Sequence, residues 1–101
     1  HSLRERRRSL RVLLAEDNAV NRRLAARLLE KRGHSVVAVA DGAEALVAFR
    51  ASRFHVVLMD VQMPVMNGYE ATQAIRQLDN GKANIPIIAM TAILIAIPYL
   101  T

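Results

Sequence analysis

Three acidic residues follow directly on apolar runs of this 101-residue sequence. Glu16 and Asp17 come after LRVLLA, and Asp60 comes after VVLM. Carboxylates brought to one place repel one another, and at least one would take up a proton unless a cation sat among them. Oxygen ligands of this kind suit Mg²⁺, which uses one or two carboxylates together with waters and phosphate oxygens. Beside Mg²⁺, a carboxylate can attack a phosphorus centre and become an aspartyl phosphate.

A fourth polar residue, Thr91, follows the apolar run IPIIAM. Its hydroxyl could donate a hydrogen bond to a phosphoryl oxygen held nearby. Taken singly, each of these residues could be no more than a water-exposed cap at the end of a strand. That alternative is much weaker for residues that end three different strands together.

Other chemistries are excluded by what the sequence lacks. It contains no cysteine, which rules out disulfides, thiolate nucleophiles and Cys-ligated zinc. Its three histidines, His1, His34 and His55, are scattered without the spacing of metal ligands, and we assign no function to His55. Because only two Phe and two Tyr are present and Trp is absent, the core must be built from Val, Leu, Ile, Ala and Met.

The positive charge is concentrated at the start of the chain. The formal net charge is +5, but residues 1–11 hold five arginines against one glutamate, a local +4 that leaves +1 for the rest. We therefore divide the chain into a basic leader or linker, residues 1–9, and a nearly neutral domain, residues 10–101. Such a leader could contact phosphates or anionic lipid, but a solvated linker or the end of a preceding helix is commoner. We expect no nucleic-acid binding by the domain itself.

No apolar run reaches the roughly 18 residues that a membrane span requires. The nearest, IPIIAMTAILIAIPYL, is interrupted by prolines and by Thr91, and the basic leader lacks the apolar core of a signal peptide. The expectation is a cytoplasmic domain with no transmembrane segment in this chain.

Short apolar runs alternate with stretches of helical spacing along the chain. In the first helical stretch Val20, Leu24 and Ala25 share one face, and Gly33 supplies the stop. Asp41 is placed to cap the second helix, with Glu44 as its capping-box partner. The predicted strands are 10–15, 35–40, 54–60 and 85–91, and the predicted helices are 18–32, the stretch after Asp41, and 69–78.

The resulting order, β-α-β-α-β-α-β, predicts a parallel sheet with helices on both faces, joined by right-handed crossovers. In such α/β sheets ligands bind outside the carboxyl ends of the strands, beside the switch in strand order. Because the acidic residues and Thr91 all stand at strand ends, we expect them to meet at that edge.

The sequence also resembles a known family, the phosphoacceptor receiver domains of two-component response regulators. The resemblance rests on LLAEDNAVNRRLAARLLEKRGHSV, ADGAEAL, VVLMDVQMPVMNGYEA and IPIIAMTA, which match the family pattern in order and spacing over residues 10–92. AEDNAVNRR and MDVQMPVMNGYEA look most like the receivers attached to hybrid sensor histidine kinases. The resemblance implies a doubly wound, flavodoxin-like α/β fold.

By matching position, the resemblance implies roles for the residues at the strand ends. Asp60 would be the phosphoacceptor, Asp17 a direct ligand of Mg²⁺, and Glu16 a ligand that acts largely through water. The backbone carbonyl of Gln62 would be the third protein ligand, and Thr91 would be the switch hydroxyl.

The remaining matches concern loops and the end of the chain. The small Ala92 would leave room for the phosphoryl group, and Pro64 and Gly68 would shape the loop after Asp60. After Ala92 the match fails: the family continues through a helix, a fifth strand ending in an essential Lys, and a fifth helix, whereas ILIAIPYLT follows here. YLT resembles the fifth strand just before its Lys, which would place Tyr99 at the switch-aromatic position.

On this comparison the C-terminal β/α part of the domain is shortened or missing. Either the sequence omits or compresses part of a longer protein, the alternative that we favour, or the chain is a genuine truncation. In the second case an exposed ILIAI segment would favour self-association.

We therefore predict a phosphorelay domain that accepts a phosphoryl group on Asp60, with Mg²⁺, from a histidine kinase or a histidine phosphotransfer protein. Phosphorylation would switch its conformation and so control a partner or an attached domain. The domain is a phosphoacceptor rather than a turnover enzyme, although its parent could be a hybrid histidine kinase. The alternative is a pseudo-receiver, an interaction module of the same fold that phosphorylation does not regulate, and the missing Lys favours it. A Mg²⁺-dependent phosphatase is a weaker third class, because those enzymes use a second Asp where Gln62 stands.

Overall fold

The computed structural model describes residues 9–61, 63, 65–78 and 84–90. In chain order its elements are β1 (Arg11–Ala15), α2 (Ala19–Lys31), β2 (Ser35–Val39), α3 (Gly42–Ala51), β3 (Val56–Met59), α4 (Gly68–Arg76) and β4 (Ile87–Ala89). The alternation of strands and helices predicted from the sequence is confirmed. The strands are shorter than predicted at one or both ends, and the last helix begins at Gly68 and ends at Arg76 rather than running from 69 to 78.

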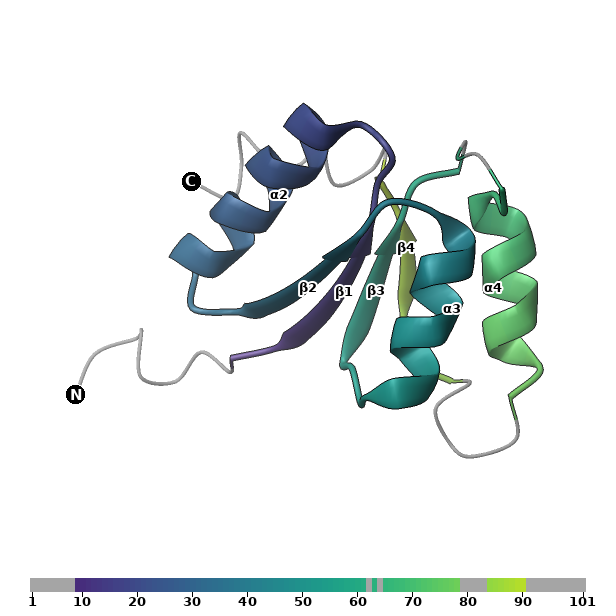
Figure 1. The fold of residues 1–101 in the computed structure, drawn as a ribbon. Helices are drawn as coiled ribbons and strands as arrows, with labels where there is room; N and C mark the ends of the chain where they lie inside the picture. Colours follow the sequence, from purple (N-terminus) through teal and green to yellow (C-terminus); the bar gives the residue numbers. More distant parts are fainter. Residues whose placement is uncertain (1–8, 62, 64, 79–83, 91–101) are drawn as a thin grey trace.

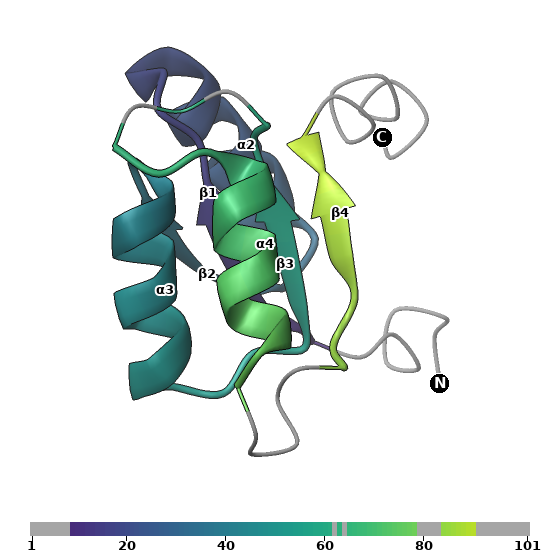
Figure 2. The same ribbon diagram turned by 90° about the vertical axis from the view of Figure 1, so that its right-hand side faces the viewer.

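The four strands form one parallel sheet in the order β2-β1-β3-β4. Figure 1 shows α2 on one face of this sheet and α3 and α4 on the other, and Figure 2 shows α3 and α4 side by side. This is the flavodoxin-like, doubly wound arrangement that the family resemblance implied. Its strand order changes direction between β1 and β3, so the carboxyl ends of these two strands flank the position where such sheets bind ligands.

Alternating residues of β1 and β3 divide the core between the two faces of the sheet. Leu13 and Val57 pack under α3 and α4 in a cluster that includes Phe49 and Ile75, all fully buried. The expectation of a core without aromatic residues was therefore wrong, because both phenylalanines of the chain are buried there. The opposite face is covered less completely. Its cluster beneath α2 consists of Val12, Leu14, Ala25, Leu58 and Met90.

The apolar stripe predicted for α2 is only partly buried. Ala25 is 2% exposed, but Val20 is 69% and Leu24 is 47% exposed. Sharing a face therefore does not give the three side chains the same burial. Helical spacing identifies a common face, but how much of that face is covered depends on the neighbouring elements. Here Ala25, with the partly buried Ala26 and Leu29, packs against the cluster of β1 and β3 residues.

Side chains fix where the helices begin. Asn18 caps α2 by accepting from the Asn21 N–H at 2.9 Å, and Asp41 caps α3 by accepting from the Glu44 N–H at 2.8 Å.

The predicted capping box of α3 is half right, because the Glu44 carboxylate accepts from the Ala40 N–H rather than from that of Asp41. A complete capping box lies at the start of α4, between Asn67 and Glu70, where none was predicted.

The turn after α2 ends the helix at the predicted place. Gly33 has a φ of +88°, a conformation that side chains disfavour. The Gly33 N–H donates to the Glu30 carbonyl and the His34 N–H to that of Leu29, which are the two bonds of a Schellman motif. This turn leads directly into β2.

Two histidines hold the amino end of β1. His34 and His55 precede β2 and β3, the strands on either side of β1, and their Nδ1 atoms accept from the consecutive N–H groups of Leu10 and Arg11 at 3.0 and 2.8 Å. The His55 N–H returns a bond to the Arg11 carbonyl, and the Arg11 guanidinium lies 5.7 Å from the centre of the Phe54 ring. His55, to which the sequence assigned no function, thus has a structural contact.

Candidate functional site

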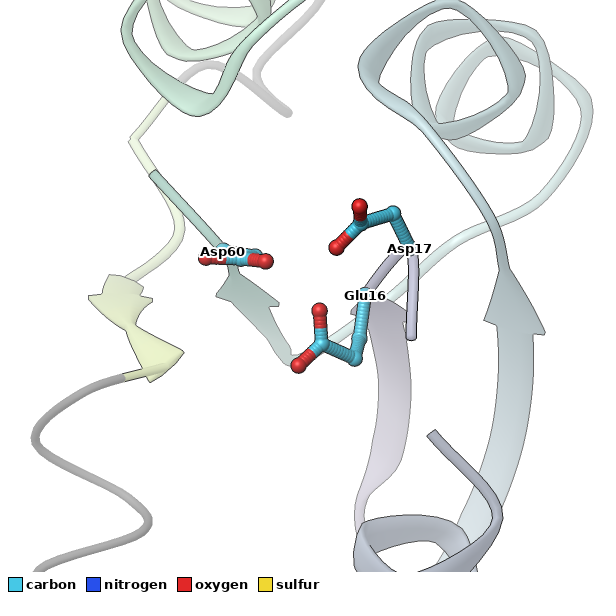
Figure 3. Close-up of side chains that lie close together, drawn as sticks. All are labelled: Glu16, Asp17 and Asp60. Atoms are coloured by element: carbon cyan, nitrogen blue, oxygen red, sulfur yellow. The ribbon is translucent and has the colours of Figure 1, made fainter. Parts of the chain in front are cut away.

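The carboxyl ends of β1 and β3 bring three carboxylates together. Glu16 and Asp17 directly follow β1, and Asp60 directly follows β3. The parallel register pairs Ala15 with Met59, which sets Glu16 and Asp60 level on neighbouring strands. Figure 3 shows the three side chains directed into the same space. One ligand oxygen from each of the three lies within 4.8 Å of the others, as the predicted convergence required.

Backbone hydrogen bonds fix these positions. The Asp60 N–H donates to the Ala15 carbonyl at 2.9 Å, which extends the β1–β3 ladder to the acidic residue itself. The Glu16 N–H donates to the Val39 carbonyl at 3.1 Å and ties the other side of β1 to β2. The carboxylates therefore project from a rigid sheet edge rather than from independent loops.

The three carboxylates differ in exposure. Glu16 is 4% exposed and is the single buried polar residue of the part that the structure describes. Asp60 is half-buried and Asp17 is exposed. Consecutive residues of an extended chain point in opposite directions, so one member of the Glu16–Asp17 pair turns inward and the other toward solvent.

Burial and the neighbouring acid make the charged form of Glu16 unfavourable. Burial is the main cause that raises the pKa of Glu16, from its ordinary 4.5 to about 7, and a hydrogen bond with Asp60 and the charge of Asp60 add to it. The backbone N–H of Asn18, 3.4 Å from Glu16 Oε2, acts in the opposite direction. Near neutral pH the cluster thus holds its negative charge against an electrostatic cost.

The donor set fits a hard divalent cation. All three ligand atoms are carboxylate oxygens at close range, and oxygen ligands are those that Mg²⁺ prefers. A cation among them would offset the repulsion that raises the pKa of Glu16. Asp17, the exposed member, leaves one side of the cluster open to solvent, where water or a phosphoryl group could approach.

The turn that carries Glu16 and Asp17 has a partner that the sequence did not reveal. Arg22 Nη1 donates to the Glu16 carbonyl at 2.9 Å and lies 3.3 Å from that of Asp17. In the sequence, Arg22 is only one of several basic residues of this helical stretch. Its single sequence signal is its position one helical turn after the N-cap Asn18, from which a side chain can reach back over the turn.

The loop after Asp60 is held at both ends. The Gly68 N–H donates to the Val61 carbonyl at 3.0 Å, and the Gly42 N–H of α3 donates to that of Met66 at 2.9 Å. A Cβ atom on Gly68 would collide with the carbonyl oxygen of Asp60. Gly68 therefore lies against the backbone of Asp60, which is a physical reason for glycine at this point of the loop.

Five residues given roles from the sequence lie outside the residues that the structure describes. They are Gln62, Pro64, Thr91, Ala92 and Tyr99. Their roles, including the Gln62 carbonyl as a metal ligand and Thr91 as the switch hydroxyl, stay predictions.

Comparison with known proteins identifies the family. The family model for the response regulator receiver domain matches residues 12–94. Hybrid signal transduction histidine kinase I of Dictyostelium discoideum is 44% identical over 88 residues, and sensor protein GacS of Pseudomonas syringae pv. syringae is 46% identical over 87. The matches cover 81% and 84% of this chain but only 5% and 10% of those proteins. The chain thus spans a small part of the curated relatives it matches.

Solved structures agree. The receiver domain of the sensor histidine kinase PA1611 from Pseudomonas aeruginosa PAO1, with a magnesium ion coordinated in its active site cleft, is 40% identical with a TM-score of 0.75. The match covers 81% of this chain and 66% of that one. A chain from the co-crystal structure of the Saccharomyces cerevisiae phosphotransfer protein Ypd1 and the receiver domain of Ssk1 is 29% identical, with a TM-score of 0.73 and coverage of 80% and 62%. With its sequence match, its sheet order and its relatives in agreement, this chain belongs to the response regulator receiver domains of two-component signalling.

Proposed function

We propose that this receiver domain accepts a phosphoryl group on the carboxylate of Asp60 from a phosphohistidine donor. The observation that carries the proposal is the convergence of Asp60 with Glu16 and Asp17 at the carboxyl ends of adjacent parallel strands. In the transfer an Asp60 oxygen forms a bond to phosphorus while the bond from phosphorus to the donor imidazole nitrogen breaks. The imidazole leaves with the electron pair of that bond, and the product is an aspartyl phosphate.

Mg²⁺ is the cofactor that we propose for this site, held by Glu16, Asp17 and Asp60. When bound, it supplies positive charge that offsets the charge of the phosphoryl group. Asp17 and Glu16 give the site its negative charge, and the bond from the Asp60 N–H to the Ala15 carbonyl fixes the nucleophile on the sheet edge. Support for the metal comes from the magnesium ion in the receiver of PA1611 and from the oxygen donor set of this chain.

A histidine kinase or a histidine phosphotransfer protein is the proposed donor. The co-crystal structure of Ypd1 with the Ssk1 receiver supports the second kind of partner. Similarity to hybrid kinases supports a parent protein of that class, in which this domain would control an attached or separate partner. Phosphorylation would act by shifting the balance between two conformations, with Thr91 as the proposed hydroxyl contact.

Within the residues that the structure describes, every helix is too short or too polar to cross a membrane. The cytoplasmic location stays a prediction. Self-association through residues 93–97 also stays a prediction, since that segment lies outside the described residues.

The chemistry is tested by labelling. The domain, within its full-length protein, is incubated with Mg²⁺ and a phosphorylated histidine kinase or phosphotransfer donor. We expect a label that is stable in acid and labile in base, as an acyl phosphate is, and that Asp60→Asn abolishes while the variant stays folded. Persistent labelling of Asp60→Asn would move the acceptor elsewhere. A folded wild type that binds Mg²⁺ and takes up no label would favour the pseudo-receiver.

The metal site is tested by Mg²⁺ titration followed by amide resonances. Asp17→Asn should weaken binding about tenfold or more because it removes a charged ligand. The matched control is Glu30→Gln, an exposed acid of α2 whose loss changes the net charge by the same amount. Resonances near Asp17 and Asp60 that do not move with Mg²⁺ would contradict the site.

A further inference from the structure

One arginine of α2 contacts the backbone that carries two of the three carboxylates. Arg22 Nη1 donates to the Glu16 carbonyl at 2.9 Å and approaches the Asp17 carbonyl at 3.3 Å. A single guanidinium nitrogen thus bridges the consecutive carbonyls of the acidic pair. Hydrogen bonds from a charged donor are stronger than neutral ones, so this contact restrains the turn more than an amide donor would.

Arg22 differs from the other arginines of its helix. It is half-buried, whereas Arg23 and Arg27 are exposed. Its own N–H donates to the Asn18 carbonyl at 2.8 Å, which places it in the first turn of α2. Side chains of a helix lean toward its N-terminus, and this carries the guanidinium back over residues 16–18.

The same turn is also held through a side chain. The Asn18 N–H approaches Glu16 Oε2 at 3.4 Å, while the Asn18 side chain caps α2 through the Asn21 N–H. Arg22 holds the backbone of the turn, and Asn18 contacts the carboxylate that the turn presents. Both contacts act on the turn that presents Glu16 and Asp17.

The charge of Arg22, taken alone, would weaken the binding of a cation at the carboxylate cluster. A positive group near the cluster repels a second cation, so its removal should strengthen Mg²⁺ binding if charge alone mattered. The guanidinium of Arg22 donates to neutral backbone carbonyls of the acidic pair, which is the arrangement of a clamp and not of a counter-ion. The two effects have opposite signs, and an experiment can therefore separate them.

We propose that Arg22 is a positioning residue, which clamps the Glu16–Asp17 turn so that both carboxylates face the cation together with Asp60. The inference rests on the proposed metal site and adds a residue outside the set of ligands. Groups that orient the ligands of a metal typically change its affinity by about 10–100-fold when they are removed. Because Arg22 acts through the backbone, we expect the lower end of that range, about tenfold.

The test compares Arg22→Gln with Arg23→Gln. Both variants remove one positive charge from adjacent positions of the same helix, but only the first removes the clamp. Mg²⁺ affinity is measured by titration, and urea unfolding checks that both variants are folded. We expect about a tenfold loss of affinity for Arg22→Gln and less than a twofold change for Arg23→Gln. Equal affinities, or tighter binding by Arg22→Gln, would overturn the inference.

A second readout works without metal and keeps the two proposals apart. In chelator, amide resonances of residues 16–18 should shift or broaden in Arg22→Gln and stay unchanged in Arg23→Gln. If these amides do not respond to the loss of Arg22, the clamp does not exist, whatever the metal does. If the wild-type chain fails to bind Mg²⁺ although the amides respond, the proposed metal site fails while the clamp stands.

Discussion

The two ends of the central strands use polar groups in opposite ways. At the amino end, the imidazoles of His34 and His55 accept from consecutive backbone N–H groups of Leu10 and Arg11, and donor and acceptor satisfy each other. At the carboxyl end, Glu16 and its two acidic neighbours crowd together, and the pKa of Glu16 rises to about 7. One end is complete in the folded chain alone, and the other carries an electrostatic cost that a cation would relieve.

This difference separates residues that stabilise the fold, at the amino end, from the carboxylates of the proposed metal site, at the carboxyl end. Interactions that hold the sheet together should lower stability when they are removed and leave Mg²⁺ binding unchanged. Residues of the carboxyl end should affect Mg²⁺ binding in every case and stability in either direction, because functional sites retain strained or repelling groups. Three experiments compare the two ends.

The largest effect should come from a pair of glycines, one at each end. A methyl group at Gly68 collides with the Asp60 carbonyl, so Gly68→Ala should lower the free energy of unfolding by about 2–3 kcal/mol, a cost typical of overpacking. It should also displace Asp60 and weaken Mg²⁺ binding. Gly33→Ala meets no atom within 4 Å, but its φ of +88° should cost about 1–2 kcal/mol with Mg²⁺ affinity unchanged.

Urea unfolding and Mg²⁺ titration of the two variants give the answer. Equal Mg²⁺ affinity in Gly68→Ala and Gly33→Ala would show that the loop behind Asp60 does not position its carboxylate. It would also remove the physical reason given for glycine at residue 68.

The next effect is a dependence of stability on pH that originates at the carboxyl end. The folded state raises the pKa of Glu16 from 4.5 to about 7, so it binds the proton more tightly than the unfolded chain does. In metal-free protein, the resulting stabilisation is fully present below about pH 4.5 and is lost as the pH rises through about 7. Glu16→Gln should remove this part of the pH dependence. The measurement compares the free energy of unfolding against pH for the wild type and for the variant.

Mg²⁺ provides the matching control for the pH experiment. A cation at the cluster favours the charged carboxylate, so saturating Mg²⁺ should restore stability to the wild type above pH 7. Identical pH profiles for wild type and Glu16→Gln would show that burial of Glu16 does not disfavour its charge.

The smallest effect belongs to the histidines. His34→Ala removes the acceptor of the part-buried Leu10 N–H and should cost about 1 kcal/mol. His55→Ala should cost less, because water can replace the ring at the exposed Arg11 N–H. Neither variant should change Mg²⁺ affinity. A histidine variant that weakened Mg²⁺ binding as Asp17→Asn does would show that the two ends are coupled.

The sequence predicted the features that depend on periodicity. Buried strands that alternate with helices imply a parallel sheet. In a parallel sheet, the residues that follow the strands all lie at the same edge. The order of the elements and the residue types at their ends therefore placed Glu16, Asp17 and Asp60 at one edge of the sheet, and the strand order implied by the resemblance made β1 and β3 neighbours there. Their assigned roles came from the family resemblance, and those roles stay predictions.

What the sequence missed depends on contacts between elements. Arg22 and Arg23 look alike in the sequence, and only the three-dimensional path of the turn shows which one reaches the carbonyls. Val20 has the spacing of a core residue, yet nothing in a helical pattern tells whether that side of α2 is covered. The capping box of Asn67 and Glu70 was visible as a spacing of three residues and could have been found.

The split of the carboxylate cluster between β1 and β3 has a consequence for folding. Glu16 and Asp60 lie far apart in the chain and become neighbours only after the parallel pairing of β1 with β3 is in register. A short peptide such as VVLMDVQMPVMNGYEA carries one carboxylate of the three, so the proposed metal affinity would belong to the assembled sheet and not to the motif. A slip of β3 by one residue would turn Asp60 to the other face of the sheet. Binding of the proposed cation would thus favour the correctly paired chain over its mispaired forms.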